Sequence, residues 1–153
     1  MNQLQGIYCR ARNPGSAFLR TAMWSSWSHV ATVFGPGLWT PGDDPTPYTV
    51  IDATFWHDVS QRPLKDVLDS SSKFSLKLVD CPDIVAAQRF AVAQIGKKYD
   101  TKGVLGIGLH RDWQEDDCWF CSELFEAILA AGGNQRFINQ SGRVTPQHSW
   151  MVR

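Results

Sequence analysis

Two apolar segments on either side of an irregular loop constrain the fold most strongly. Residues 29–34, HVATVF, and residues 48–54, YTVIDAT, are rich in β-branched side chains, which favours two buried strands. Residues 35–47 contain four prolines and three glycines, a composition typical of a loop. Because this loop lets the chain reverse, the sequence predicts that the two strands pair antiparallel.

Periodicity, capping residues and turn residues predict the elements around this pair. They are strands at 6–9 and 73–80, helices at 15–24, 62–71, 81–98 and 116–131, and a short helix from Pro146. Ser16 and Thr145 are expected to cap the first and last helices, and Gly132-Gly133 to end the helix at 116–131. Glycine-rich residues 99–115 are expected to be irregular and partly helical. Since no repeat or linker divides the chain, we expect one α+β domain over residues 1–153, an antiparallel sheet packed against a helix that carries a cysteine.

Charge and composition exclude several classes of protein. Lysine plus arginine and aspartate plus glutamate number 15 each, so the net charge is zero and nucleic acid is not expected as a partner. No apolar run reaches the length of a membrane span, and the N-terminus has no secretory signal. A cytoplasmic location is therefore the default expectation; a version that acts on cell walls would need a phage or secretion-system route. The sequence does not indicate an oligomeric state.

Cys118 and Cys121 form a Cys-x-x-Cys pair that admits several interpretations. A structural zinc site needs four ligands, and here the second half of the pattern is missing, although His110 could join. A thioredoxin-like redox pair should follow a strand, which the residues before Cys118 do not resemble. The four cysteines are too scattered for a disulfide framework, so we expect reduced thiols.

The third interpretation gives Cys121 alone a chemical role. Cys121 lies on the same helical stripe as Leu124, Phe125, Ile128 and Leu129, so it could simply pack in the core. Its place in the first helical turn instead favours a thiolate, because unpaired backbone N–H groups point there. Two acidic residues just before the pair would disfavour an anion, and we expect them to cap the helix instead; they are Asp116 and Asp117.

A thiol nucleophile needs a base, and the strand pair offers one. His29 opens the first strand, and Asp52 is a carboxylate among apolar residues of the second. Buried carboxylates are rare unless paired, so Asp52 should have a partner. If the two strands pair, Asp52 can hold one imidazole nitrogen while the other faces a thiol. A structural role for His29 in packing remains the alternative.

The order of these segments resembles a known family. SHVATVF, then VIDA on the next strand, then KKYD and WFCSELF, and a final VTPQHSW are similar to the circularly permuted NlpC-type branch of papain-like cysteine peptidases and amidases. This branch includes relatives of lecithin:retinol acyltransferase, and in it the histidine strand precedes the cysteine helix. The resemblance covers residues 6–150 and implies a permuted papain-like fold.

The resemblance implies a role for four residues. Cys121 would be the nucleophile, His29 the general base and Asp52 the orienting residue, at a position where the family more often has glutamate or histidine. Tyr99 would support the site or contact an oxyanion, or else pack as an ordinary aromatic residue. Cys118 has no counterpart.

The implied activity is hydrolysis of an amide, such as a cell-wall peptide, or of an acyl ester, or acyl transfer through an acyl-enzyme, with no cofactor or metal. The tryptophans at 24–27, 39 and 56 could form an apolar wall for a lipid or aromatic group, or belong to the core. The alternatives are a non-catalytic binding module of the same fold and a zinc-binding domain that uses Cys118 and Cys121.

Overall fold

A five-stranded antiparallel sheet forms the centre of the computed structural model, which describes residues 2–102, 118–137 and 144–152. Its strands lie in the order β4-β3-β2-β1-β5. Their bounds are β1 Gln3–Ala11, β2 His29–Phe34, β3 Thr49–Thr54, β4 Asp58–Pro63 and β5 Ser71–Asp80. Together with the helices, the sheet confirms the predicted α+β class, and β2 and β3 pair antiparallel as expected.

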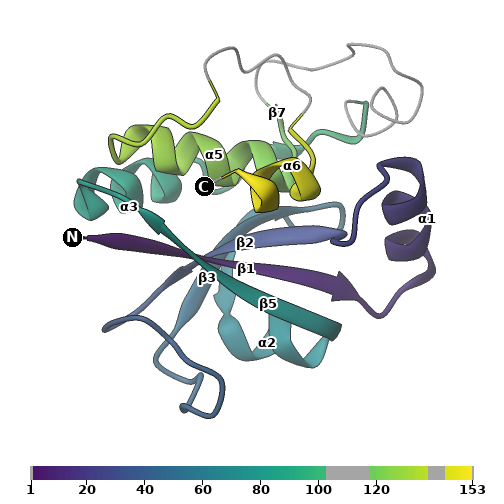
Figure 1. Ribbon diagram of the computed structural model, residues 1–153, viewed down its shortest axis with the longest axis horizontal. Helices are drawn as coiled ribbons and strands as arrows, with labels where there is room; N and C mark the ends of the chain where they lie inside the picture. Colours follow the sequence, from purple (N-terminus) through teal and green to yellow (C-terminus); the bar gives the residue numbers. More distant parts are fainter. Residues whose placement is uncertain (1, 103–117, 138–143, 153) are drawn as a thin grey trace.

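Helices cover both faces of the sheet (Figure 1). On one face lie α3 (Ile84–Ala93), α5 (Cys121–Ala131) and α6 (Pro146–Met151), while α2 (Leu64–Asp69) lies on the other. The helix α1 (Pro14–Ala22) stands at the end of the sheet where β1 finishes. Two short strands, β6 (Lys98–Tyr99) and β7 (Cys118–Trp119), form a separate parallel pair.

Alternation along the strands explains why both faces are apolar. In β2, Val30 and Phe34 pack in the core under α5, while Ala31 and Val33 belong to the core on the side of α2. Successive strand residues point to opposite faces, so a run such as HVATVF fills two cores at once.

The position of α5 depends on one glycine in β1. A Cβ atom at Gly6 would lie 2.8 Å from the ring of Phe125, so only a glycine allows the helix to approach the strand this closely. The helix ends as predicted at Gly132-Gly133, where Gly133 adopts a left-handed φ of 89°. These contacts fix the start of α5, and with it Cys121, against the sheet.

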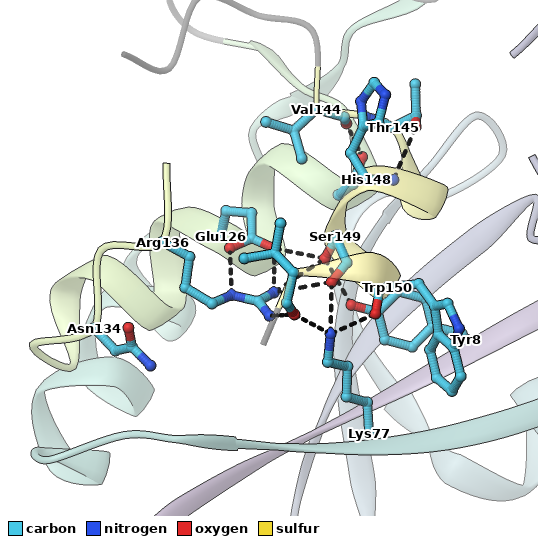
Figure 2. Close-up of polar contacts among 12 residues, drawn as sticks. Tyr8, Lys77, Glu126, Asn134, Arg136, Val144, Thr145, His148, Ser149 and Trp150 are labelled. Carbon is cyan, nitrogen blue, oxygen red and sulfur yellow. Dashed lines mark hydrogen bonds and ion pairs between the residues drawn. The ribbon is translucent and has the colours of Figure 1, made fainter. Parts of the chain in front are cut away.

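A buried polar cluster docks α6 onto α5 and the sheet (Figure 2). Arg136 donates two hydrogen bonds to the carboxylate of Glu126, at 2.5 and 3.0 Å, and the Ser149 hydroxyl donates a third at 2.5 Å. Tyr8 Oη lies 2.6 Å from the same hydroxyl, and Lys77 donates to the carbonyl of Ser149 at 3.0 Å. The side chains of Glu126 and Arg136 are only 1% and 2% exposed, so this ion pair is sealed from solvent, and Lys77 lies beside it.

Several predicted boundaries were wrong. Asn13, not Ser16, caps α1: its side chain accepts a hydrogen bond from the Ser16 amide at 2.7 Å. The strand predicted at 6–9 extends over Gln3–Ala11, because its outer residues pair with β5. The helix predicted at 81–98 is limited to Ile84–Ala93, because Asp83 caps its start and Gly96 adopts a left-handed φ shortly after its end.

The largest miss is β4. Residues 62–71 were predicted as a helix, but Arg62 and Pro63 complete a strand and the helix covers only Leu64–Asp69. Strand β4 lies at the sheet edge, and among its residues only Val59 is fully buried, so its sequence carries no alternating pattern.

The helix predicted from residue 116 begins only at Cys121, and most of residues 99–115 lie outside the described residues. Within the described part of the chain, no helix is long and apolar enough to cross a membrane.

Candidate active site

The sheet brings His29 and Asp52 together. The register that pairs Thr32 with Ile51 places Asp52 on the same face as His29, on the neighbouring strand. His29 Nε2 lies 2.7 Å from Asp52 Oδ2. The Asp52 side chain is fully buried while the imidazole keeps 15% of its surface exposed, so the pair faces solvent from the histidine side.

Arg62 on β4 is a second partner of Asp52 and was not predicted. Its guanidinium donates to both oxygens of Asp52, Nη2 to Oδ2 at 2.6 Å and Nε to Oδ1 at 3.2 Å. Asp52 pairs with Ser60 in the sheet register, so Arg62 lies two residues further along on the same face. Because the edge strand itself was missed, the sequence offered no signal that Arg62 would reach the carboxylate.

Each ionised partner favours the charge on the other. Burial alone would raise the pKa of Asp52, but the hydrogen bond and charge of His29, and then those of Arg62, outweigh it and lower that pKa below its usual value. Burial would also lower the pKa of His29. Hydrogen bonds to Asp52 and Cys121 reverse this and raise the pKa to about 9. The imidazole is therefore protonated at neutral pH.

Cys121 is the second side-chain partner of His29 and the first residue of α5. Phe120 precedes it in an extended conformation, and the Phe120 amide donates to the Glu123 carboxylate at 3.2 Å. This bond fixes the first turn, where N–H groups have no acceptor within the helix. Cys121 is 2% exposed. Since α5 begins at Cys121, the prediction that Asp116 and Asp117 cap it was wrong; both residues lie outside the described residues.

Tyr99 lies close to the same thiol. Burial, and next the nearby Cys121, raise the pKa of its phenol well above the usual value. Its ring centroid lies 6.1 Å from that of Phe120 and 6.4 Å from that of Phe55. The backbone amide of Tyr99 donates to Asp58 at 3.0 Å, which holds β6 beside the β3–β4 turn. The structure thus places Tyr99 at the site, packed among aromatic rings.

The Cys-x-x-Cys pair is divided between two elements. Cys118 is half-buried in β7 and Cys121 is buried at the start of α5, so only the second lies on the helix. Cys9, Cys81, Cys118 and Cys121 form no disulfide among the described residues. Among the described residues, no group of three histidine, cysteine or acidic side chains is arranged to hold a metal ion. His110, named above as a further ligand, lies outside them.

The tryptophans divide between the core and the surface. Trp27 and Trp39 are 6% and 3% exposed and belong to the two cores. Trp24 and Trp56 are 93% and 77% exposed and stand at the surface. Trp56 packs edge-on against Phe55, which in turn contacts Tyr99, so an aromatic series leads from the surface toward the site.

No protein-family model matches the chain, and no curated protein matches it. Among solved structures, the chain is similar to YiiX of Escherichia coli O157:H7, which is described as a metalloprotein. The two superpose with a TM-score of 0.61 at 19% sequence identity, and the match covers 88% of this chain and 68% of YiiX. This likeness establishes a shared fold.

Proposed function

We propose that the protein is a cysteine hydrolase or acyltransferase with the fold of the circularly permuted NlpC-type papain-like family. The observation that carries this proposal is the imidazole of His29, which is bonded to the Asp52 carboxylate at 2.7 Å and has the Cys121 thiol near enough to raise its pKa. A thiol, an imidazole and an orienting carboxylate are the groups that thiol-dependent acyl transfer requires. The order of these residues along the chain matches the family pattern.

The chemistry follows from the charges. A protonated His29 beside Cys121 favours the thiolate, and the first turn of α5 favours an anion there as well. The thiolate attacks the carbonyl carbon of an amide or ester, and the Cys121 amide, at the start of α5, donates to the oxyanion. His29 then gives its proton to the leaving group, and water or another acceptor resolves the acyl-enzyme. Asp52 holds the ring in one orientation through Nε2.

An activated ester tests this proposal without knowledge of the natural substrate. We expect p-nitrophenyl acetate to give a burst of one equivalent of nitrophenol and an acetyl adduct on the peptide that contains Cys121, read by mass spectrometry. Cys121→Ala should abolish both, and the matched control Cys118→Ala should keep both. An unchanged burst in Cys121→Ala, or a folded parent protein without any adduct, would favour the non-catalytic binding module.

The metal-binding alternative rests on the description of YiiX as a metalloprotein. In this chain it would use Cys118 and Cys121 as part of the ligand set, and it predicts stoichiometric zinc on the purified protein. Metal analysis of the parent and of Cys118→Ala separates the two proposals, because the hydrolase needs only Cys121 of the pair.

A further inference from the structure

The first 42 residues carry a net positive charge in a chain whose net charge is zero, because they contain no acidic residue. Residues 1–42 contain three arginines, Arg10, Arg12 and Arg20, and no aspartate or glutamate. Two of them, Arg10 at the end of β1 and Arg20 in the last turn of α1, line the same surface cavity. The hydrolase proposal assigns no role to these residues.

The cavity has the composition of an oxyanion site. It has a volume of about 340 Å³, and its lining residues are Arg10, Arg20, Thr21, Trp24, Ser25 and Ser26. Two guanidinium groups and the Ser26 hydroxyl supply hydrogen-bond donors, and no carboxylate lies among these lining residues. The hydroxyls of Thr21 and Ser25 already donate to the carbonyls of Ala17 and Trp27, at 3.0 and 2.5 Å. Arginine is well suited to phosphate, because its planar fork can donate two parallel hydrogen bonds.

Both arginines retain donors for a ligand. Arg10 uses Nε to donate to the Ser26 carbonyl at 2.7 Å, and its guanidinium lies 6.0 Å from the Trp27 ring centroid. Arg20 uses Nε to donate to the Ser16 carbonyl at 3.3 Å. Among the residues that the structure describes, neither forms an ion pair with a carboxylate. Their terminal nitrogens therefore have no counter-charge from the described protein.

Trp24 gives the cavity an apolar side. It is 93% exposed and has a left-handed φ of 49°, a conformation uncommon and strained for a bulky residue. The turn that imposes it is closed by the Ser25 amide, which donates to the Arg20 carbonyl at 2.9 Å. An indole ring held in solvent beside two arginines fits a ligand that joins an anionic group to an apolar part.

The cavity lies at the same end of the sheet as His29. Cys9, which precedes Arg10, is the register partner of His29, and the Ser28 amide donates to the Cys9 carbonyl at 3.0 Å. Ser26, in the cavity lining, is three residues before His29. Arg10 follows Cys9 in β1, so its side chain leaves the sheet on the face opposite to that of Cys9 and His29. A substrate bound here would therefore have to pass around the end of β1 and β2 to reach the imidazole.

We propose that this cavity binds a phosphate group carried by the substrate of the site at Cys121. The inference rests on the proposed function for its link to catalysis, and on the two arginines and the Ser26 hydroxyl for its chemistry. The phosphate could belong to a soluble ester or to a lipid headgroup, and these two sources differ in what presents the group to the protein.

Phosphate binding can be measured in the full chain. We expect inorganic phosphate and glycerol phosphate, titrated separately, to shift the NMR signal of the Trp24 indole N–H. Arg20→Gln should weaken binding by about tenfold or more, because it removes one charged hydrogen-bond partner. Arg89→Gln, which changes an exposed arginine on α3, is the matched control and should bind as the parent does. Equal affinity in Arg20→Gln and the parent would overturn the proposal.

Vesicles distinguish the two sources. If the group belongs to a lipid, phosphatidylcholine vesicles that contain phosphatidic acid should retain the parent protein, pure phosphatidylcholine should not, and Arg20→Gln should lose the retention. Binding of glycerol phosphate without retention supports a soluble ester. Retention that does not depend on Arg20, or no response to any of the phosphate probes, contradicts the inference.

This inference can fail independently of the hydrolase proposal. Arg20→Gln should keep the acetyl adduct at Cys121 with the small neutral ester, because that ester has no group for the cavity. If the adduct forms and phosphate does not bind, only the phosphate site is wrong. If phosphate binds and no adduct forms, the cavity remains a binding site and the hydrolase proposal fails.

Discussion

Two buried carboxylates in this protein are each paired with an arginine, but their surroundings differ. Asp52 and Glu126 each accept two hydrogen bonds from one arginine, Arg62 and Arg136 respectively. Around Glu126 the arginine is 2% exposed and the other hydrogen-bond donor is the hydroxyl of Ser149. Around Asp52 the arginine is 21% exposed and the other partner is an imidazole.

The comparison shows what separates a structural ion pair from a reactive one. The Glu126 cluster links α5, α6 and β1. Among the described residues, it contains no imidazole and no thiol. The Asp52 cluster contains His29, which is partly exposed and contacts Cys121. Similar carboxylate–arginine geometry thus stabilises a fold in one place and orients a proton carrier in the other.

The largest expected effect is on stability at the sealed cluster. Arg136→Met leaves the buried Glu126 carboxylate without its partner, which should lower the free energy of unfolding by about 3–5 kcal/mol. The double variant Glu126→Leu with Arg136→Met should recover most of that loss, because it leaves no buried charge. Urea unfolding of the three proteins checks this, and equal losses in the single and the double variant would contradict it.

A smaller loss is expected at the open cluster. Asp52→Asn removes the charge but leaves Arg62 and His29 within reach of water, so the free energy of unfolding should fall by about 1–3 kcal/mol. The pKa of His29 should fall from about 9 toward its usual value, because the charge of Asp52 no longer favours the imidazolium. NMR titration of the imidazole measures this shift. Asp69→Asn is the control, and a His29 pKa that stays near 9 in Asp52→Asn would show that Asp52 does not set it.

The pH dependence of stability should have opposite signs at the two clusters. The folded pKa of His29 is raised, so its contribution is present at low pH and is lost as the pH rises through about 9. The free energy of unfolding should therefore fall by up to about 2 kcal/mol between pH 7 and pH 9, and His29→Ala should flatten this fall. Chemical unfolding at several pH values checks the slope.

Lys77, beside the sealed cluster, should act in the other direction. Burial, and next the charge of Arg136, lower its pKa to about 8, so folding is favoured as the pH rises above that value. In Lys77→Met this rise above pH 8 should disappear, while the His29-dependent fall should remain. If His29→Ala and Lys77→Met change the slope in the same direction, the sign of one shift is wrong.

The smallest effect is expected at an exposed ion pair of similar length. Lys65 Nζ lies 2.5 Å from Asp69 Oδ2 on α2, and both side chains are more than half exposed. Lys65→Ala should leave the unfolding free energy unchanged within error, because solvent screens such a pair. A loss comparable to that of Asp52→Asn would mean that burial is not what distinguishes these clusters.

The structural features that depend on local sequence pattern could be predicted from the sequence. The β-branched runs predicted β2 and β3, the loop between them predicted their pairing, and the Asp52 carboxylate in an apolar strand predicted a buried partner. The edge strand β4 has no such pattern, so Arg62 was missed. The start of α5 was misplaced because acidic residues before a helix look like caps, whereas the Phe120 amide is bonded to Glu123 inside the helix. Long-range pairs such as Glu126 with Arg136 depend on how α5 packs, which no local pattern records.

The coupling of Cys121 to His29 is the central claim, and the pH dependence of iodoacetamide alkylation tests it most directly. Each cysteine is followed by peptide mass spectrometry in the parent protein and in His29→Ala. The account predicts that Cys121 alone reacts rapidly well below pH 8 in the parent and loses this advantage in His29→Ala, while Cys9, Cys81 and Cys118 react alike in both. If Cys121 is protected from alkylation in both proteins, or reacts at the same rate in both, the result contradicts a thiolate–imidazolium pair. Cys121 would then be a packing residue of the core.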